Sequence, residues 1–216
     1  VLERESGKEY RLVPSGPMVE PAEWRQCLNQ LQTAQCDYLV ASGSLSPGIP
    51  DDFYGQVVAM MTERNIPVVP DSSGAGLRGG LEQGGVFLVK PSIGELRQFT
   101  GRDLPDTESV GRAAMQIVGG GHAQYVAVTM GHEGALLASA ERQLLLPAVD
   151  IEVRSAVGAG DSFLSAMVFA ISSGWEIEEA FRFGIAAGAA AVMNPGHDLA
   201  RPEDIRRLYS QVRAAS

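Results

Sequence analysis

The chain has 216 residues, enough for one sizeable domain with a complete hydrophobic core. Hydrophobic residues make up 45% of it and charged residues 20%, and the formal net charge is −9. This acidity argues against nucleic acid and anionic membranes as partners, because both attract clustered Lys and Arg. No bilayer-spanning segment or signal peptide is visible. Cys27 and Cys36 lack metal-ligand spacing, so we expect two reduced thiols in a cytoplasmic protein.

Strand-like and helix-like segments alternate along the chain. In order, we expect a strand at 8–13, a helix at 21–32, a strand within 37–48, a helix at 51–65, strands within 66–74 and 85–92, helices at 92–101 and 106–121, a strand within 124–131, short apolar runs at 134–139, 142–147 and 149–153, and helices at 161–174, 176–194 and 202–215. Strands that are apolar throughout have both faces covered. The pattern therefore predicts one α/β domain, a mostly parallel sheet flanked by helices in three layers.

Small and polar residues follow the expected strands, in the stretches SGSLSPG, PDSSG, KPSIGE, TMGHEG and VGAGD. Ligands of parallel α/β sheets gather at the carboxyl ends of the strands. Hydroxyls, two acids and a lysine at that edge suit a phosphate-bearing ligand better than an apolar one.

The GAGD turn at residues 158–161 gives the most specific functional hypothesis, an anion site next to a catalytic carboxylate. Small residues before a helix let backbone amides converge, and this attracts an anion. The carboxylate of Asp161 would repel that anion unless it has a task, such as accepting the proton of an alcohol during phosphoryl transfer. Complementing the helix dipole is the competing interpretation, and the four residues alone favour it. The turn matches neither a Walker A loop nor GxGxxG.

Two acids and three histidines leave alternatives open. Glu95 follows Ser92 by three residues, which predicts either a capping box or a carboxylate for hydrated Mg²⁺. Asp71 could share the metal or close an Asx turn. His122 and His197 read as solvated loop residues. His132 lies at a strand end, where it could contact a nucleotide. A role as an ordinary turn residue is the favoured interpretation.

GSLSPG, DSSG, KPSIGEL, GHEGAL and SAVGAGDSFLSA, in this order, resemble the ribokinase-like (PfkB) carbohydrate kinases, closest to the phosphofructokinase B branch. FRFGIAAGAAAVMNPG continues the resemblance, which covers essentially the whole chain. It implies a three-layer α/β/α ribokinase-like fold with a small β lid, of which residues 1–15 would be a remnant. It also implies ATP and Mg²⁺ as cofactors, and a homodimer paired through the lids in the full-length form.

The resemblance implies a role for particular residues. Asp161 would be the catalytic base, and the amides of Gly158, Ala159 and Gly160 would form the anion hole for the γ-phosphate. Residues implied near the nucleotide and its metal are Lys90, Ser92, Glu95, Thr129, Gly131, His132, Gly134, Ile185, Ala189 and Asn194, with Asp71 assisting Glu95 at Mg²⁺. Ser44 would touch the sugar, and Arg11 would reach the sugar's own phosphate. Several relatives bind a monovalent cation such as K⁺, and the matching positions are Ser155, Val157, Ala191, Asn194 and Gly196.

Two departures from the family accompany these expectations. The signature beside Glu95 is Asn-x-x-Glu, whereas this chain has Ser92. The family's first strand, most of its lid and its Gly-Gly sugar-binding motif have no counterpart here, so we expect the 216 residues alone not to turn over sugar. The implied reaction is ATP-dependent phosphorylation of fructose 6-phosphate. Alternatives are fructose 1-phosphate, tagatose 6-phosphate, an unphosphorylated sugar or a nucleoside as acceptor, or a nucleotide-binding module without catalysis.

Overall fold

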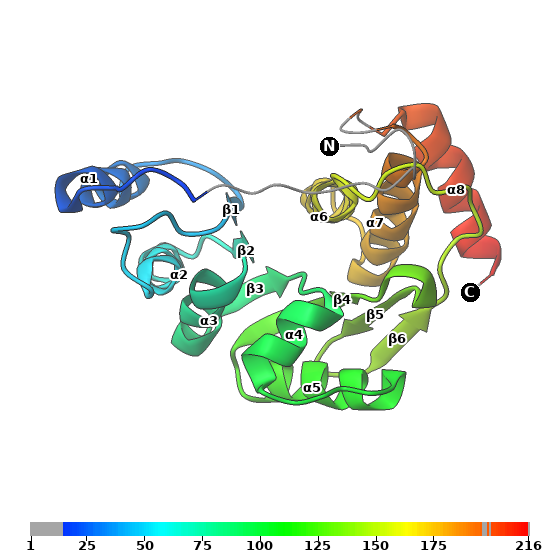
Figure 1. The fold of residues 1–216 in the computed structure, drawn as a ribbon, viewed down its shortest axis with the longest axis horizontal. Helices are drawn as coiled ribbons and strands as arrows, with labels where there is room; N and C mark the ends of the chain where they lie inside the picture. Colours follow the sequence, from blue (N-terminus) through cyan, green and yellow to red (C-terminus); the bar gives the residue numbers. More distant parts are fainter. Residues whose placement is uncertain (1–14, 196–197, 199, 216) are drawn as a thin grey trace.

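The computed structural model describes residues 15–195, 198 and 200–215 (Figure 1). The strand expected at 8–13, the lid remnant up to residue 14, Arg11, Gly196 and His197 therefore lie outside the described residues. Across the described ranges, no helix has the length and apolar character needed to cross a membrane.

The observed elements follow the expected order closely. They are α1 (Pro21–Leu31), β1 (Leu39–Ser42), α2 (Phe53–Glu63), β2 (Val68–Asp71), α3 (Gly74–Gln83), β3 (Val86–Val89), α4 (Ile93–Thr100), α5 (Thr107–Gly119), β4 (Ala123–Thr129), the 3-10 turn η1 (Gly131–Glu133), β5 (Ala135–Ala138), β6 (Gln143–Leu146), α6 (Ala159–Ser172), α7 (Ile177–Val192) and α8 (Pro202–Ala214). The apolar run at 149–153 forms no strand, and α6 begins two residues earlier than expected.

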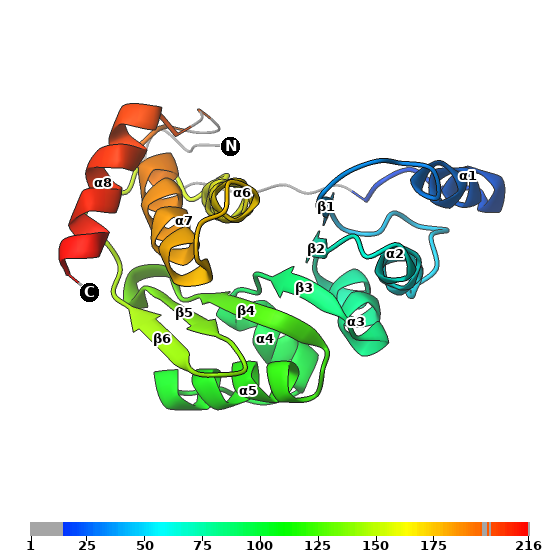
Figure 2. The same ribbon diagram turned by 180° about the vertical axis from the view of Figure 1, so that it is seen from behind.

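The strands lie side by side in chain order (Figures 1 and 2). β1 pairs in parallel with β2, and β3 pairs in parallel with β4. Strand pairing among the described residues gives two sheets, β1–β2 and β3–β4–β5–β6, which meet where β2 lies next to β3. In the second sheet, β5 and β6 add an antiparallel hairpin beside β4. The parallel strands bring the ends of β2, β3 and β4 toward one edge, where an isolated bridge joins Ser92 to Thr129.

Helices cover both faces of the sheet, as expected for three layers (Figure 2). Alternate residues of β4 and β5 point to opposite faces because side chains alternate along a strand. Val126, Val128 and Leu136 belong to the core shared with α2–α5. Ala127 and Leu137 belong to the core shared with α6, α7 and α8. The inner strands β4 and β5 are therefore covered on both sides, as expected for apolar strands, whereas β1 and β6 are partly exposed, with Val40 46% and Leu145 50% exposed.

Helix α3 was not expected from the sequence, because four of its ten residues are glycine, a poor helix former. Close packing against α2 explains why the helix forms. A Cβ built on Gly79 would lie 2.4 Å from the carbonyl oxygen of Asp51, and one on Gly76 would lie 2.9 Å from the Tyr54 ring. The missing side chains let the two helices approach to backbone contact, so tertiary packing outweighs local propensity here.

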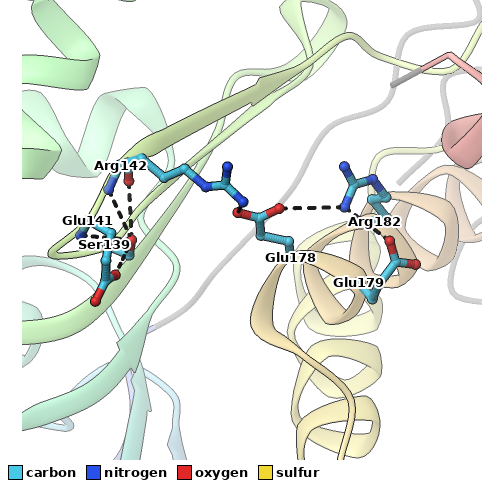
Figure 3. A network of polar contacts seen from close by, with 6 residues as sticks. All are labelled: Ser139, Glu141, Arg142, Glu178, Glu179 and Arg182. Carbon is cyan, nitrogen blue, oxygen red and sulfur yellow. Dashed lines mark hydrogen bonds and ion pairs between the residues drawn. The ribbon is translucent and has the colours of Figure 1, made fainter.

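A chain of polar contacts ties the β5–β6 hairpin to the first turn of α7 (Figure 3). The Arg142 guanidinium pairs with Glu178 across this junction. Arg182 then pairs with Glu179 at 3.1 Å and reaches Glu178 at 4.0 Å. Within the hairpin, the hydroxyl of Ser139 accepts the backbone N–H of Arg142 at 3.3 Å. We call Arg142, Glu178, Glu179 and Arg182 the surface network.

Candidate active site

The first turn of α6 forms one end of the candidate site. Gly158 precedes it with φ 77°, a left-handed conformation that glycine adopts without steric cost. Its carbonyl accepts the N–H of Ser162 at 2.9 Å, so the GAGD turn feeds directly into the helix. The preceding loop is fastened to the end of α7, because Arg154 and Ser155 both donate backbone N–H groups to the carbonyl of Val192, at 2.8 and 3.3 Å.

A cavity of about 660 Å³ opens beside this turn. It brings together the predicted residues from three segments of the chain. Its walls include Thr129, Gly131, His132, Gly134, Ala159, Gly160, Ile185 and Ala189. Residues from the end of β4, the start of α6 and the last turns of α7 thus meet around one space, as expected for a nucleotide-sized ligand.

The α7 side of this cavity is apolar and lies close to α6. Ile185, Ala189 and Val192 face the space, together with Phe163 of α6. A Cβ built on Gly188 would lie 3.2 Å from the carbonyl oxygen of Ala159, so that glycine allows α7 to approach the GAGD turn. One continuous wall therefore runs from an apolar slot to the amides at the start of α6.

Charged side chains converge beyond the α6 end of the cavity. Lys90 Nζ lies 3.5 Å from Asp71 Oδ1, with the two side chains 8% and 18% exposed. Burial raises the pKa of Asp71 above its ordinary value, the charge of Lys90 opposes this, and the nearby charges of Asp161 and Glu95 raise it further. The charges of Lys90, Asp161 and Glu95 therefore all act on the Asp71 carboxylate. Asp161 itself is exposed, and the described part of the chain contains no ion pair to it.

Glu95 and Ser92 form the capping box that the sequence left open as one alternative. The backbone N–H of Ser92 donates to Glu95 Oε2 at 2.8 Å, and the Ser92 hydroxyl donates to the same oxygen at 2.9 Å. The N–H of Glu95 in turn donates to Ser92 Oγ at 3.3 Å. Ser92 therefore holds one oxygen of Glu95 in place. Glu95 lines a second, smaller cavity of about 310 Å³, between α2, α3 and α4.

The residues present fit a hydrated Mg²⁺ better than a fully protein-ligated ion. No group of three His, Cys, Asp or Glu among the described residues could hold a metal directly. Asp71 and Glu95 nonetheless provide hard carboxylate oxygens, and burial, with the like charges of Asp161 and Glu95, raises the pKa of Asp71. Mg²⁺ commonly keeps several waters and uses one or two carboxylates plus substrate phosphates. The donor set therefore suits that mode of binding.

The remaining predicted residues, Asp161 and Gly158 among them, do not line the larger cavity. Ser44 is exposed in the loop after β1. The neighbouring Gly43 carbonyl accepts the Tyr54 hydroxyl at 2.8 Å. For the expected monovalent cation, Ser155 is buried and its hydroxyl accepts the Val157 N–H at 3.2 Å. The N–H of Asn194 donates to the carbonyl of Ala191 at 3.1 Å. Ser155, Ala191 and Asn194 are thus gathered where the 154–157 loop meets the end of α7.

Two sequence interpretations need correction or addition. The sequence predicts a solvated loop residue at His122, but its Nδ1 lies 2.8 Å from the carbonyl oxygen of Leu81 and the side chain is partly buried. The cavity wall also includes residues 148–151 and 153, which were not predicted. Their apolar run resembled a strand, and its position directly before the GAGD turn was the signal that could have marked it as part of the site.

Comparisons with known proteins identify the family of the chain. The pfkB family carbohydrate kinase domain matches residues 1–204. An ATP-dependent 6-phosphofructokinase isozyme 2 from Mycobacterium tuberculosis is 36% identical over 97% of this chain and 62% of its own length. The crystal structure of phosphofructokinase-2 from Escherichia coli in complex with potassium superposes with a TM-score of 0.92 and 35% identity, covering 96% of this chain and 68% of that one. The chain belongs to the pfkB family of carbohydrate kinases.

A more distant structure extends the fold relationship. The structure of Arabidopsis thaliana ribokinase complexed with ribose and ATP has a TM-score of 0.68 at 21% identity, over 90% of this chain and 61% of that one. At that identity the likeness shows the fold alone, which is the ribokinase-like α/β fold expected from the sequence. The 216 residues span less than two thirds of the length of the Mycobacterium tuberculosis relative.

Proposed function

We propose that the protein is an ATP-dependent sugar-phosphate kinase that phosphorylates fructose 6-phosphate, and that this chain carries its nucleotide-binding and phosphoryl-transfer residues. The observation that carries the proposal is the continuous cavity wall from Ile185 and Ala189 to Ala159 and Gly160. An apolar slot at one end suits a nucleobase, and the amides at the other end suit phosphate. Asp161 follows directly, where an acceptor hydroxyl would meet the transferred group.

In the proposed reaction, the carboxylate of Asp161 accepts the proton of the acceptor hydroxyl as its oxygen attacks the γ-phosphorus and ADP leaves. The amides of Gly158, Ala159 and Gly160 stabilise the charge on the transferred phosphoryl group. Glu95 and Asp71 would hold the hydrated Mg²⁺, which supplies charge neutralisation on the phosphates when bound. Thr129, Gly131, His132 and Gly134 would border the phosphates and ribose.

A further set of proposed contacts completes the site. Lys90 and Ser92 would lie near the nucleotide, Asn194 would border the adenine, and Ser44 would contact the sugar. Ser155, Val157, Ala191 and Asn194 would coordinate a monovalent cation through their oxygens. The relative from Mycobacterium tuberculosis is named for 6-phosphofructokinase activity, which supports fructose 6-phosphate as the first acceptor to test.

The decisive experiment measures ADP formation by the protein at its full natural length. Fructose 6-phosphate, fructose 1-phosphate, tagatose 6-phosphate, ribose and adenosine are compared as acceptors, with fructose 6-phosphate expected to give the highest kcat/KM. Asp161→Asn should lower kcat by about 10²- to 10⁴-fold, because the general base is lost. Asp37→Asn, at an exposed position before β1, is the matched control and should leave the rate unchanged. An Asp161→Asn variant with the wild-type rate contradicts the proposal.

A further inference from the structure

Gly43 is the first residue after β1 and directly precedes Ser44, the proposed sugar contact. Its backbone N–H donates to the carbonyl of Asp71, at the end of β2, at 2.9 Å. Its carbonyl accepts the hydroxyl of Tyr54 at 2.8 Å. Its φ is 116°, a conformation that residues with a side chain rarely adopt. Both polar backbone groups of this glycine are therefore fixed, one by the sheet and the other by α2.

Tyr54 reaches Gly43 from the first turn of α2 and is itself held firmly. It is only 7% exposed. Its ring lies against the glycine face of α3, because a Cβ built on Gly76 would be 2.9 Å from Cδ2 of the ring and one on Gly80 would be 3.6 Å from the Tyr54 Cβ. Burial raises the pKa of Tyr54, so the hydroxyl stays protonated and remains a hydrogen-bond donor at neutral pH.

The hydrogen bond from Tyr54 fixes the peptide group that leads into Ser44. The Gly43 carbonyl and the Ser44 N–H belong to one planar peptide group, and no peptide bond among the described residues is cis. In a trans peptide the two groups point in opposite directions, so holding the carbonyl toward Tyr54 turns the Ser44 N–H away from it. Gly43 and Ser44 are both exposed. A buried phenol thus sets the direction of an exposed serine.

We propose that Tyr54 is a positioning residue for the acceptor sugar, which fixes the Gly43–Ser44 peptide so that Ser44 is held ready for a sugar hydroxyl. Gly76 and Gly80 take part because they leave the room that the Tyr54 ring occupies. This inference rests on the proposed function and deepens it. It assigns a binding task to a hydroxyl that a phenylalanine of the same shape would lack.

The test measures KM separately for fructose 6-phosphate and for ATP, with the protein at its full natural length. Tyr54→Phe keeps the ring and removes the hydroxyl. It should raise KM for fructose 6-phosphate about two- to tenfold, as expected for loss of one neutral hydrogen bond, and leave KM for ATP unchanged. Tyr209→Phe, which removes a hydroxyl bonded to Glu179, is the matched control and should change neither value. An equal rise in both KM values for Tyr54→Phe overturns the inference.

A double-mutant cycle tests whether Tyr54 acts through Ser44. Ser44→Ala should also raise KM for fructose 6-phosphate. The two substitutions combined should raise it by less than the product of their single effects, because residues that share one contact are not additive. Effects that multiply in full would show that Tyr54 acts independently of Ser44, which overturns the inference.

The glycine face of α3 provides a second variant. Gly76→Ala places a methyl group against the Tyr54 ring and should raise KM for fructose 6-phosphate without changing KM for ATP. In α5, a Cβ on Gly119 would meet no atom within 4 Å, so Gly119→Ala is the control. Circular dichroism establishes that each variant is folded. A Tyr54→Phe variant that melts at a lower temperature but keeps the wild-type KM for fructose 6-phosphate has lost a merely structural bond, and this overturns the inference.

The proposed function and the inference fail differently. If the wild-type protein at its full natural length phosphorylates no acceptor, the proposed function is refuted and the inference with it. If it phosphorylates fructose 6-phosphate and Tyr54→Phe keeps the wild-type KM, only the inference is refuted.

Discussion

The Asp71–Lys90 pair and the Arg142–Glu178 pair of the surface network contain the same kinds of charge in different surroundings, although Arg182 of that network is itself only 14% exposed. Lys90 and Asp71 are 8% and 18% exposed, whereas Arg142 is 67% exposed and its partner Glu178 26%. Removing charges from water costs several kcal/mol per ion, so a buried pair gains little net stability, although breaking it is expensive. Solvated pairs have small effects either way. The buried pair therefore contributes little net free energy of unfolding, which is consistent with a role in binding.

The largest expected effect follows from removing the acid of the buried pair. Asp71→Ala leaves the Lys90 ammonium without its partner, and we expect the free energy of unfolding to fall by about 3 kcal/mol. Urea denaturation measures this change. Asp103→Ala, at an exposed position after α4, is the control and should stay within about 0.5 kcal/mol of wild type. A loss for Asp71→Ala as small as the control's would show that the pair is effectively solvated.

An intermediate effect is expected at the start of α4. Ser92→Ala removes the side-chain cap and the hydroxyl contact with Glu95, and it should cost about 1 kcal/mol of stability. Ser73 precedes α3 without a side-chain capping bond, so Ser73→Ala is the matched control and should cost less. Denaturation curves for the two variants, recorded together, test whether the loss of stability comes from the missing cap or from replacing a serine at the start of any helix.

Breaking the surface network should change stability little. Arg142→Gln separates the β5–β6 hairpin from Glu178, and the expected loss is about 0.5 kcal/mol or less. That loss should shrink further in 1 M salt, where exposed charges are screened over about 3 Å. Melting temperatures at low and high salt measure it. A loss comparable to that of Asp71→Ala would erase the contrast between the two regions.

The smallest effect at neutral pH is expected at Tyr209, which donates a hydrogen bond to Glu179 at 2.6 Å. Burial, with the hydrogen bond and charge of Glu179 adding to it, raises the pKa of Tyr209 to about 12. Because this value lies above the ordinary pKa of about 10, the stabilisation is fully present below pH 10 and is lost as the pH rises toward 12. The stability of wild type should therefore fall relative to that of Tyr209→Phe over that range in alkaline denaturation. A constant difference would contradict the assignment.

The sequence could predict much of the fold because local signals and burial agree. The apolar strands expected between residues 37 and 147 and the capping box at Ser92 are confirmed. The run at 149–153 forms no strand, and the strand expected at 8–13 lies outside the described residues. Helix α3 escaped prediction because its glycines lower helix propensity, and only contact with α2 across Gly76 and Gly79 explains it. The residues of α3 alone do not indicate that α2 packs against them.

The candidate site was predictable where a motif marked it. Residue types at strand ends drew attention to the GAGD turn and the 129–134 turn, and the family resemblance implied their roles. Ala159 and Gly160 of the first turn and Thr129, Gly131, His132 and Gly134 of the second line one cavity. The contact between Lys90 and Asp71 was not predicted, because it depends on β2 and β3 being neighbours and on the depth at which Lys90 is buried. The apolar stretch at 149–153 was likewise ambiguous until its packing beside α7 was known.

The two tryptophans provide an intrinsic fluorescence signal on each face of the sheet. Trp24 in α1 packs against the core on the α2–α5 face, while Trp175 lies between α6 and α7 with its ring 5.3 Å from that of Phe183 and 5.7 Å from that of Tyr209. Replacing either one with Phe leaves a single emitter whose fluorescence follows one face of the sheet. The two variants would therefore reveal whether both layers melt together or one after the other.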